Sequence, residues 1–227
     1  MDNSLVSMTR YKDKVSDILT NAEKYHAAYY EVEKFRGPSL YFHKRSLESL
    51  HSVNITQYLE YIYATLASWG MHRMGRGGSK MQSFDRFKES VEAIRDKISR
   101  AEKIDYSNVI EADWRLLEDI FHGIKIMASG TSIVGNSKVM AHMVPNIVPP
   151  IDREHTLKYL RGNSNIKNDL DYEWTLMKGI ISDFFIPVAK DAPFKKTADN
   201  WISNQSLYQW DTSIFKVIDN LVIGARK

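Results

Sequence analysis

The stretch SFDRFKESVEAIRDKISRA, residues 83–101, decides the fold class, because its apolar residues recur every three or four positions. These positions are Phe84, Phe87, Val91, Ile94, Ile98 and Ala101. Such spacing places them along one face of an α-helix. Ser83 stands directly before the first of them, where a serine side chain can cap the free amides of a helix. The stretch therefore predicts an amphipathic helix that begins at Ser83.

The same spacing recurs on both sides of this stretch. Upstream it predicts helices over 15–32, ending by Gly37 and Pro38, and over 55–69, with Asn54 as cap and Gln57 in the capping-box position. Downstream it predicts one helix over 107–127 and two short helices around 137–155. It then predicts a long helix over 174–188, which Pro187 kinks or ends, and a final pair, one around Trp201 and one after a cap at Asp211. Strand-like alternation is nowhere sustained. We expect one compact all-α, multi-helix domain over 1–227, with a small lobe over 131–227 as the alternative.

Composition narrows the class of protein. A chain of 227 residues with 43% hydrophobic content can bury a sizeable core without a metal or a disulfide. The absence of cysteine excludes disulfides, thiolate metal sites and cysteine nucleophiles. No apolar run approaches the roughly 18–20 residues that cross a bilayer, and the first residues lack an apolar signal core. We therefore expect a cytoplasmic protein with no membrane contact and no cofactor, and its net charge of +3 does not by itself predict a partner.

The connection GMHRMGRGGSKM, residues 70–81, is rich in glycine and basic side chains. Its backbone amides, together with Arg73, Arg76 and Lys80, could approach a phosphate. The segment is not a P-loop, because Arg76 and Gly77 replace the required lysine and hydroxyl, and a helix precedes it where a strand is needed. It predicts contact with the backbone of DNA or RNA, and the alternative is a solvated connection between helices.

The stretch VGNSKVMAHMVPNIVPPIDREH, residues 134–155, combines a lysine, two histidines, an aspartate and three prolines. Ser137 or Asn136 can cap a short helix with Lys138 in its first turn, and Pro145 ends this helix. Asp152 follows the prolines at a helix N-cap position, so it is either a structural cap or a reactive carboxylate. The histidine spacing does not match a zinc motif, and we predict no metal site.

Together with YATLASWGMHRMG, residues 63–75, this stretch resembles a family of uncharacterised prokaryotic proteins of about this length, over much of the chain. It is also similar to the helix-hairpin-helix base-excision DNA glycosylases, with a shorter connection between lysine and aspartate and a single hairpin glycine. That resemblance implies a helix-hairpin-helix-like unit near 130–160. In it, Lys138 would be the amine nucleophile that attacks the sugar C1′, and Asp152 the carboxylate that supports the cationic transition state. Gly135 and Asn136 would form the phosphate-facing turn.

Three classes of function follow from these observations. The first is a nucleic-acid-associated protein whose basic connections, with Arg153 near the second stretch, bind backbone phosphate. The alternative is a glycosylase-like enzyme, in which a lysine amine with an ordinary pKa of about 10.4 must be neutralised by burial or by a cation such as Arg153. The third is a non-catalytic interaction module or homo-oligomer, because Tyr58, Tyr61 and Tyr63 face more than one side of their helix.

Overall fold

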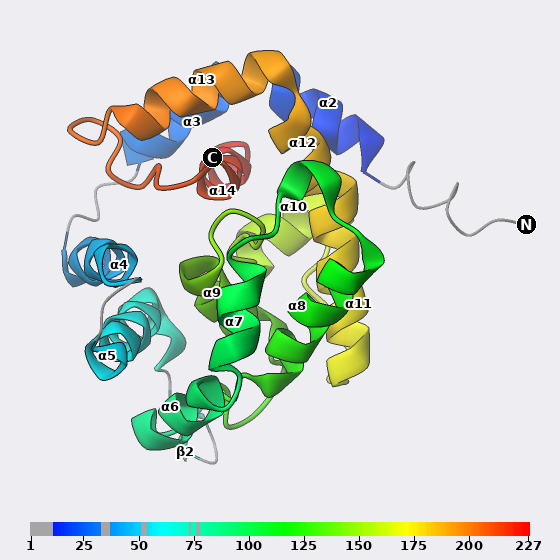
Figure 1. The fold of residues 1–227 in the computed structure, drawn as a ribbon. Coiled ribbons are helices and arrows are strands. Elements are labelled where there is room, and N and C mark those ends of the chain that lie inside the picture. The colour runs from blue at the N-terminus through cyan, green and yellow to red at the C-terminus, as the bar shows by residue number, and fades with distance from the viewer. Residues whose placement is uncertain (1–10, 33–36, 51–53, 73, 76–77) are drawn as a thin grey trace, which may run out of the picture.

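The computed structural model describes residues 11–32, 37–50, 54–72, 74–75 and 78–227. Within these ranges the protein is helical, and its only strands form a short antiparallel ribbon of β1 (Met74–Gly75) and β2 (Gly78–Ser79). The predicted all-α class is confirmed (Figure 1). In chain order, the helices and helical turns are α2 (Lys12–Thr20), α3 (Ala22–Val32), α4 (Pro38–Glu48), α5 (Ile55–Leu66), η1 (Ala67–Met71), α6 (Phe84–Glu92), α7 (Arg95–Ala101), η2 (Tyr106–Asn108), α8 (Glu111–Gly123), α9 (Ile133–Met143), η3 (Arg153–Leu157), α10 (Lys158–Arg161), α11 (Leu170–Ile180), η4 (Ile181–Phe185), α12 (Ile186–Lys190), α13 (Ala192–Ser203) and α14 (Ile214–Gly224).

Helices from early and late in the chain pack side by side (Figure 1). Helix α14 lies against α3 and also contacts α13. The two helices approach closely at Gly224, where an added Cβ would lie 2.0 Å from the backbone oxygen of Tyr25. Such a distance is far inside van der Waals contact, so only a glycine allows α14 to pack this tightly on α3.

The main core is a cluster of buried side chains that extends from Tyr11 to Val222, so helices before and after residue 131 share it. A second, small cluster consists of Tyr29, Leu40 and Trp210. Helices α9 and α14 are the most completely enclosed elements of the main core, with buried residues on nearly every side. A helix that is buried all round has to be apolar all round, unless a polar residue has a partner or a function. The polar residues of these two helices therefore define where chemistry can sit.

Two predicted helix starts are confirmed. Asn54 Oδ1 accepts a hydrogen bond from the Gln57 amide at 3.1 Å. Ser83 Oγ accepts one from the Arg86 amide at 3.5 Å. A cap satisfies an amide that the helix itself leaves free, which is why these residue types mark helix starts in a sequence.

Two predicted helices are each divided in the structure. The predicted helix over 15–32 breaks at Asn21 into α2 and α3, and the predicted helix over 84–101 becomes α6 and α7. In both cases the apolar spacing continues across the break, so the sequence pattern could not reveal it. Pro187 does not end its segment, because α11, η4 and α12 follow one another without a break as far as Lys190. The π-helical turn η4 stands directly before α12, the element that contains this proline.

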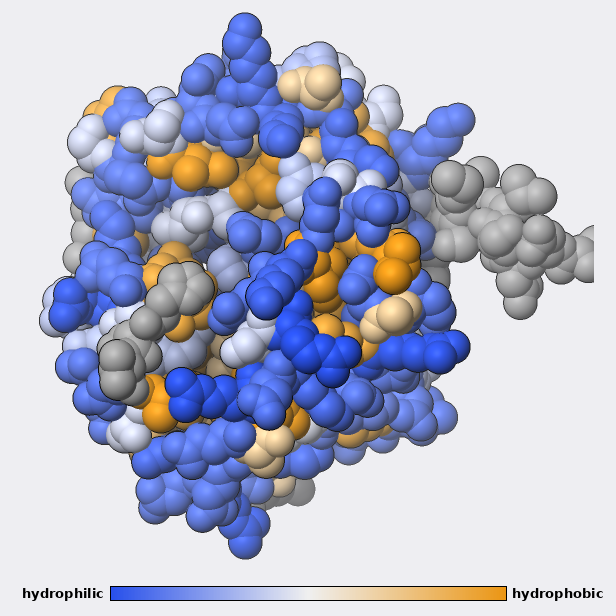
Figure 2. Space-filling view, viewed as in Figure 1, coloured by the Kyte–Doolittle hydropathy of each residue, from blue (hydrophilic) through white to orange (hydrophobic). Residues whose placement is uncertain are grey.

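The surface of the face drawn in Figure 2 is mostly hydrophilic, with apolar residues in scattered patches. Large exposed apolar side chains, such as Tyr41 in α4 and Leu207 before α14, come from different elements. Isolated apolar side chains of this kind are ordinary on a protein surface. None of the described helices combines the length and apolar content that crossing a bilayer requires.

Candidate functional site

Helix α9, which carries Lys138, is held at its start by a buried carboxylate. Glu173 Oε2 accepts hydrogen bonds from the amides of Ser132 and Ile133, both at 2.6 Å. Burial raises the pKa of Glu173, and the two amides partly oppose this effect. An anion at this place satisfies the positive end of the helix dipole. These two amides are therefore occupied and not free to hold a phosphate.

The predicted role of Gly135 and Asn136 is wrong. Both residues lie inside α9 and are buried, because the helix begins at Ile133 and not at a cap near Ser137. Asn136 Nδ2 donates to the backbone oxygen of Phe121 at 2.8 Å, and a Cβ on Gly135 would lie 2.8 Å from Ile126 Cγ2. These residues seat α9 against the segment that precedes it, and they do not form a phosphate-facing turn.

The structure brings Lys138 and Asp152 together through their chain neighbours. Ser137 Oγ accepts a hydrogen bond from the Ile151 amide at 3.0 Å, which ties the proline-bearing connection to α9. As a result, Lys138 Nζ lies 3.5 Å from Asp152 Oδ2, although the two residues are 14 positions apart. The short connection is thus sufficient to pair the amine with the carboxylate.

Asp152 has a structural role and faces the lysine at the same time. Its Oδ1 accepts hydrogen bonds from the amides of Glu154 at 2.8 Å and His155 at 3.2 Å, so the predicted helix cap is confirmed. Burial raises the pKa of Asp152, but the Lys138 ammonium and the two amides outweigh burial and lower this pKa below its ordinary value. The Oδ2 atom therefore presents a negative charge to Lys138 at neutral pH.

The indole of Trp69 lies beside the same amine. Lys138 Nζ is 5.3 Å from the centre of the Trp69 ring, within the range of a cation–π contact. Trp69 belongs to the π-helical turn η1, inside which Gly70 takes a positive φ of 76°. A glycine in this left-handed conformation interrupts the helix, so the predicted helix end at Gly70 is confirmed.

Two buried histidines stand behind the lysine in fixed tautomers. His142 Nδ1 donates to the backbone oxygen of Lys138 at 2.7 Å, so its Nε2 accepts from His43 Nδ1 at 2.9 Å. His43 Nε2 then accepts from the Thr212 hydroxyl at 3.2 Å. Burial, with Lys216 and Lys138 nearby, lowers the pKa of His142 to about 4, and burial lowers the pKa of His43 well below its ordinary value. Both rings are therefore neutral supports at neutral pH.

A second lysine–aspartate pair lies in α14. Lys216 Nζ is 2.8 Å from Asp219 Oδ2 and also donates to Asn220 Oδ1. The same ammonium stands 5.8 Å from the ring centres of Tyr29 and of Trp210. The side chains of this ion pair are only 9% and 6% exposed.

Buried polar residues hold this second pair from behind. Asn220 Nδ2 donates to Asp211 Oδ1 at 2.7 Å, and Asp211 Oδ2 lies 2.7 Å from His26 Nε2. The prediction that Asp211 caps the final helix is wrong, since Ser213 Oγ accepts the Lys216 amide at 3.2 Å in that role. Asp211 is instead fully buried.

The two pairs line one cavity of about 450 Å³. Its walls include Lys138, Asp152, Trp69, Trp210, Lys216 and Asp219. A volume of this size lies in the range of about 300–1,000 Å³ that is typical of small-ligand sites. The sequence assigned no role to the last two residues, although a charged pair three residues apart inside the apolar run SIFKVIDNLVIG is a signal that could have found them.

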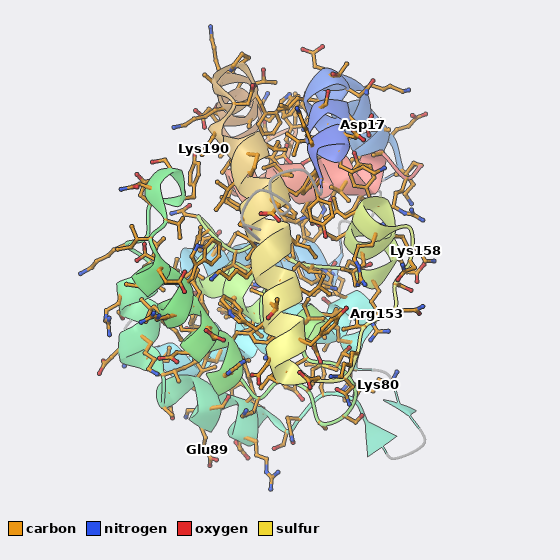
Figure 3. All side chains as sticks on the ribbon, turned by 90° about the vertical axis from the view of Figure 1, so that its right-hand side faces the viewer. Asp17, Lys80, Glu89, Arg153, Lys158 and Lys190 are labelled. Carbon is orange, nitrogen blue, oxygen red and sulfur yellow. The ribbon has the colours of Figure 1, made fainter. Side chains whose placement is uncertain are left out.

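The predicted phosphate-binding side chains are only partly within the described residues. Arg73 and Arg76 lie outside them. Lys80 is exposed, and its backbone oxygen accepts the Ala128 amide at 2.8 Å. Arg153 is exposed and donates to Thr131 Oγ1 at 2.6 Å, so it faces Thr131. Lys80 and Arg153 thus both contact the short segment 128–131. Figure 3 shows the two residues in the same region of the view, with Lys158 above them.

The three tyrosines that suggested an interface differ in their surroundings. Tyr58 is buried and donates to the backbone oxygen of His142 at 2.9 Å, and Tyr63 donates to the backbone oxygen of Gln82 at 2.7 Å. Tyr61 accepts a hydrogen bond from Gln57 at 3.1 Å and lies under the guanidinium of Arg45. Tyr58 and Tyr63 therefore serve internal contacts, and the interaction-module hypothesis loses two of its three residues.

The cavity is assembled from five separate parts of the chain: α3, α4, the η1 turn, the α9-to-η3 region, and α14 with the segment before it. The resemblance to helix-hairpin-helix DNA glycosylases stays a prediction. Comparison with protein-family models, curated proteins and solved structures finds no match to this chain, so the cavity itself has to indicate the function.

Proposed function

We propose that the protein binds nucleic acid and uses Lys138 and Asp152 to remove a base from a flipped nucleotide in DNA. The observation that carries this proposal is the 3.5 Å pairing of Lys138 Nζ with Asp152 Oδ2 in the wall of a cavity. An amine nucleophile, a carboxylate that balances cationic charge, and aromatic side chains for a base are the parts this reaction needs. The lysine and the aspartate are also the parts that the resemblance to base-excision glycosylases implies.

The reaction needs no reagent other than Lys138, Asp152 and water. The Lys138 ammonium first gives a proton to the base. The neutral Nζ then forms a bond to C1′ as the bond from C1′ to the base breaks, and the protonated base leaves as a neutral molecule with that electron pair. The sugar ring then opens as a proton moves from Nζ to O4′, which leaves an imine between Lys138 and C1′. Water hydrolyses the imine and restores the lysine. Positive charge develops on the sugar as the base leaves, and Asp152 lies where its anion stabilises that charge.

The environment of the pair suits a nucleotide that has left the duplex. Flipping a base out costs roughly a few kcal/mol in lost stacking, and stacking on an aromatic side chain returns about 1–3 kcal/mol. Trp69 and Trp210 both line the cavity, with ring centres 6.2 Å apart. Outside the cavity, Lys80 and Arg153, which flank the same short segment, offer positive charge to backbone phosphate.

The test is borohydride trapping of the wild-type protein on duplexes with an abasic site or with an oxidised, deaminated or alkylated base. Hydride reduces the imine to a stable amine and so links protein to DNA covalently. We expect a trapped adduct whose modified peptide contains Lys138. An adduct on another lysine, or no adduct with any duplex under conditions where the protein is folded, would reject the enzyme hypothesis.

The nucleic-acid hypothesis predicts binding that weakens steeply with salt, because bound cations release counterions from the phosphate backbone. Each phosphate contact contributes about 0.9 to the slope of log affinity against log salt concentration. We therefore expect Lys80→Ala/Arg153→Ala, which removes two such contacts, to reduce this slope by about 1–2. Fluorescence anisotropy across a salt series measures the slope, and Lys97→Ala/Lys190→Ala is the matched control. Equal slopes for the two double variants would count against Lys80 and Arg153 as phosphate contacts.

Asp152→Asn is expected to lower single-turnover base release by about 10²–10³-fold, because the anion opposite the developing positive charge is lost. An asparagine still accepts the amide hydrogen bonds that Asp152 makes, so the helix cap is preserved. Asp169→Asn is the control, since Asp169 caps α11 in the same way, accepting the Tyr172 amide at 2.9 Å. Equal rates for the two variants would show that Asp152 is a cap and nothing more.

A further inference from the structure

The second lysine–aspartate pair has no part in the chemistry at Lys138, and burial makes it costly. Lys216 and Asp219 are 8% and 4% exposed in a helix whose other neighbours are mostly apolar. Removing two charges from water carries a penalty that their mutual attraction often fails to recover, so such a pair is weak evidence of a stabilising role. The position of this pair in the cavity wall suggests a different role.

A second observation comes from α4. Ser39 is fully buried and lines the same cavity, and its hydroxyl has no hydrogen-bond partner among the described residues. A buried hydroxyl without a partner is unfavourable and needs an explanation. A polar ligand in the cavity would supply the missing hydrogen bond.

Resting on the function proposed above, we propose that Lys216, Asp219 and Ser39 form the subsite that holds the polar edge of the base displaced by Lys138. Its ligand class is a nucleobase that carries a hydrogen-bond acceptor beside a donor. The Lys216 ammonium donates to the acceptor, Asp219 accepts from the donor, and the Ser39 hydroxyl takes a further polar atom. Trp210 and Tyr29, whose rings flank the Lys216 ammonium, offer apolar surface to the base.

This arrangement gives the two lysine–aspartate pairs separate tasks in one cavity. Lys138 and Asp152 act on the sugar, and Lys216 and Asp219 act on the base. Asn220, Asp211 and His26 fix the second pair from behind, so the ammonium and carboxylate need not reorganise when a base enters. An abasic site has no base, and its reaction with Lys138 should not depend on the second pair.

The experiment uses Lys216→Met/Asp219→Asn, because changing both residues avoids leaving one buried charge unpaired. Single-turnover release is measured on the damaged-base duplex that the wild type processes best, and borohydride trapping is measured on an abasic duplex. We expect base release to fall by about 10- to 100-fold, since each lost hydrogen bond involves a charged group. Trapping on the abasic duplex should stay within about twofold.

The matched control is Lys178→Met/Glu111→Gln. Lys178 also pairs with a carboxylate, Glu111 at 3.4 Å, and lies 5.5 Å from a tryptophan ring, that of Trp114, but outside the cavity. We expect this control to change neither activity.

Three results would overturn the subsite. The first is that Lys216→Met/Asp219→Asn releases the base at the same rate as the wild type. The second is that this variant, while still folded, loses base release and abasic trapping to the same extent. The third is that the wild type is trapped on the abasic duplex but releases none of the damaged bases. Lys138 would then react with the sugar, and the second pair would have no base to bind. Absence of abasic trapping by the wild type has a different meaning, because it would reject the proposed function itself and the subsite with it.

Discussion

Lys138→Gln is expected to remove the trapped DNA adduct and to lower single-turnover base release by on the order of 10³-fold or more, because the nucleophile is lost. Glutamine keeps most of the side-chain length, and its amide can still donate to Asp152. The variant therefore avoids an unpaired buried carboxylate, and an effect on rate can be separated from an effect on folding.

Lys158→Gln is the control for this result. Lys158 lies in the neighbouring helix α10, but its amine pairs with Glu154 and does not line the cavity. A partly exposed amine such as that of Lys158 can also form an imine with an abasic aldehyde, so this variant shows how much of the trapping is unspecific. We expect full adduct yield from Lys158→Gln. An adduct of undiminished yield in Lys138→Gln would mean that the pair at Asp152 is only structural.

Gly224→Ala is expected to lower the free energy of unfolding by about 3 kcal/mol or more, because the new methyl group would meet backbone and not a movable side chain. The added Cβ would lie 2.0 Å from Tyr25 O and 2.9 Å from Tyr25 C. Helices α14 and α3 would have to separate, and the wall of the cavity that carries Lys216 would move with α14. Urea denaturation followed by circular dichroism measures the change.

Gly179→Ala provides the comparison in the same protein. Gly179 is a helical glycine in α11, and a Cβ there would meet nothing within 4 Å. Alanine is the better helix former, so we expect this variant to be unchanged or more stable by about 0.5–1 kcal/mol. If both variants unfolded at the same urea concentration, the close packing of α3 on α14 would be wrong.

A local signal in the sequence correctly predicted one feature of the site, whereas the predicted caps near Ser137 and at Asp211 are wrong. Asp152 was expected as a helix cap because a carboxylate after prolines satisfies free amides, and it does so in the structure. Lys138 and Asp152 were brought together only through the family resemblance. The structure supplies the physical reason, which is the hydrogen bond from the Ile151 amide to Ser137.

Contacts between distant parts of the chain could not be predicted in the same way. Glu173 occupies the start of α9 from 41 residues away, so the sequence around Lys138 gave no sign that this helix begins before Gly135. Trp69 likewise reaches Lys138 only through the η1 turn. Periodicity reports which face of a helix is buried, and it does not report what lies against that face.

The packing of α3 on α14 also has a consequence for biosynthesis. His26 and Asp211, which form a buried pair at this contact, are 185 residues apart, so α3 leaves the ribosome long before its partner exists. Contacts of such long range form late, because the chain between them must first be ordered. A nascent chain that has emerged only as far as α13 would already contain Lys138 and Asp152, yet one wall of the cavity would be missing. The site can therefore form only after α14 has been synthesised, which is late in the translation of these residues.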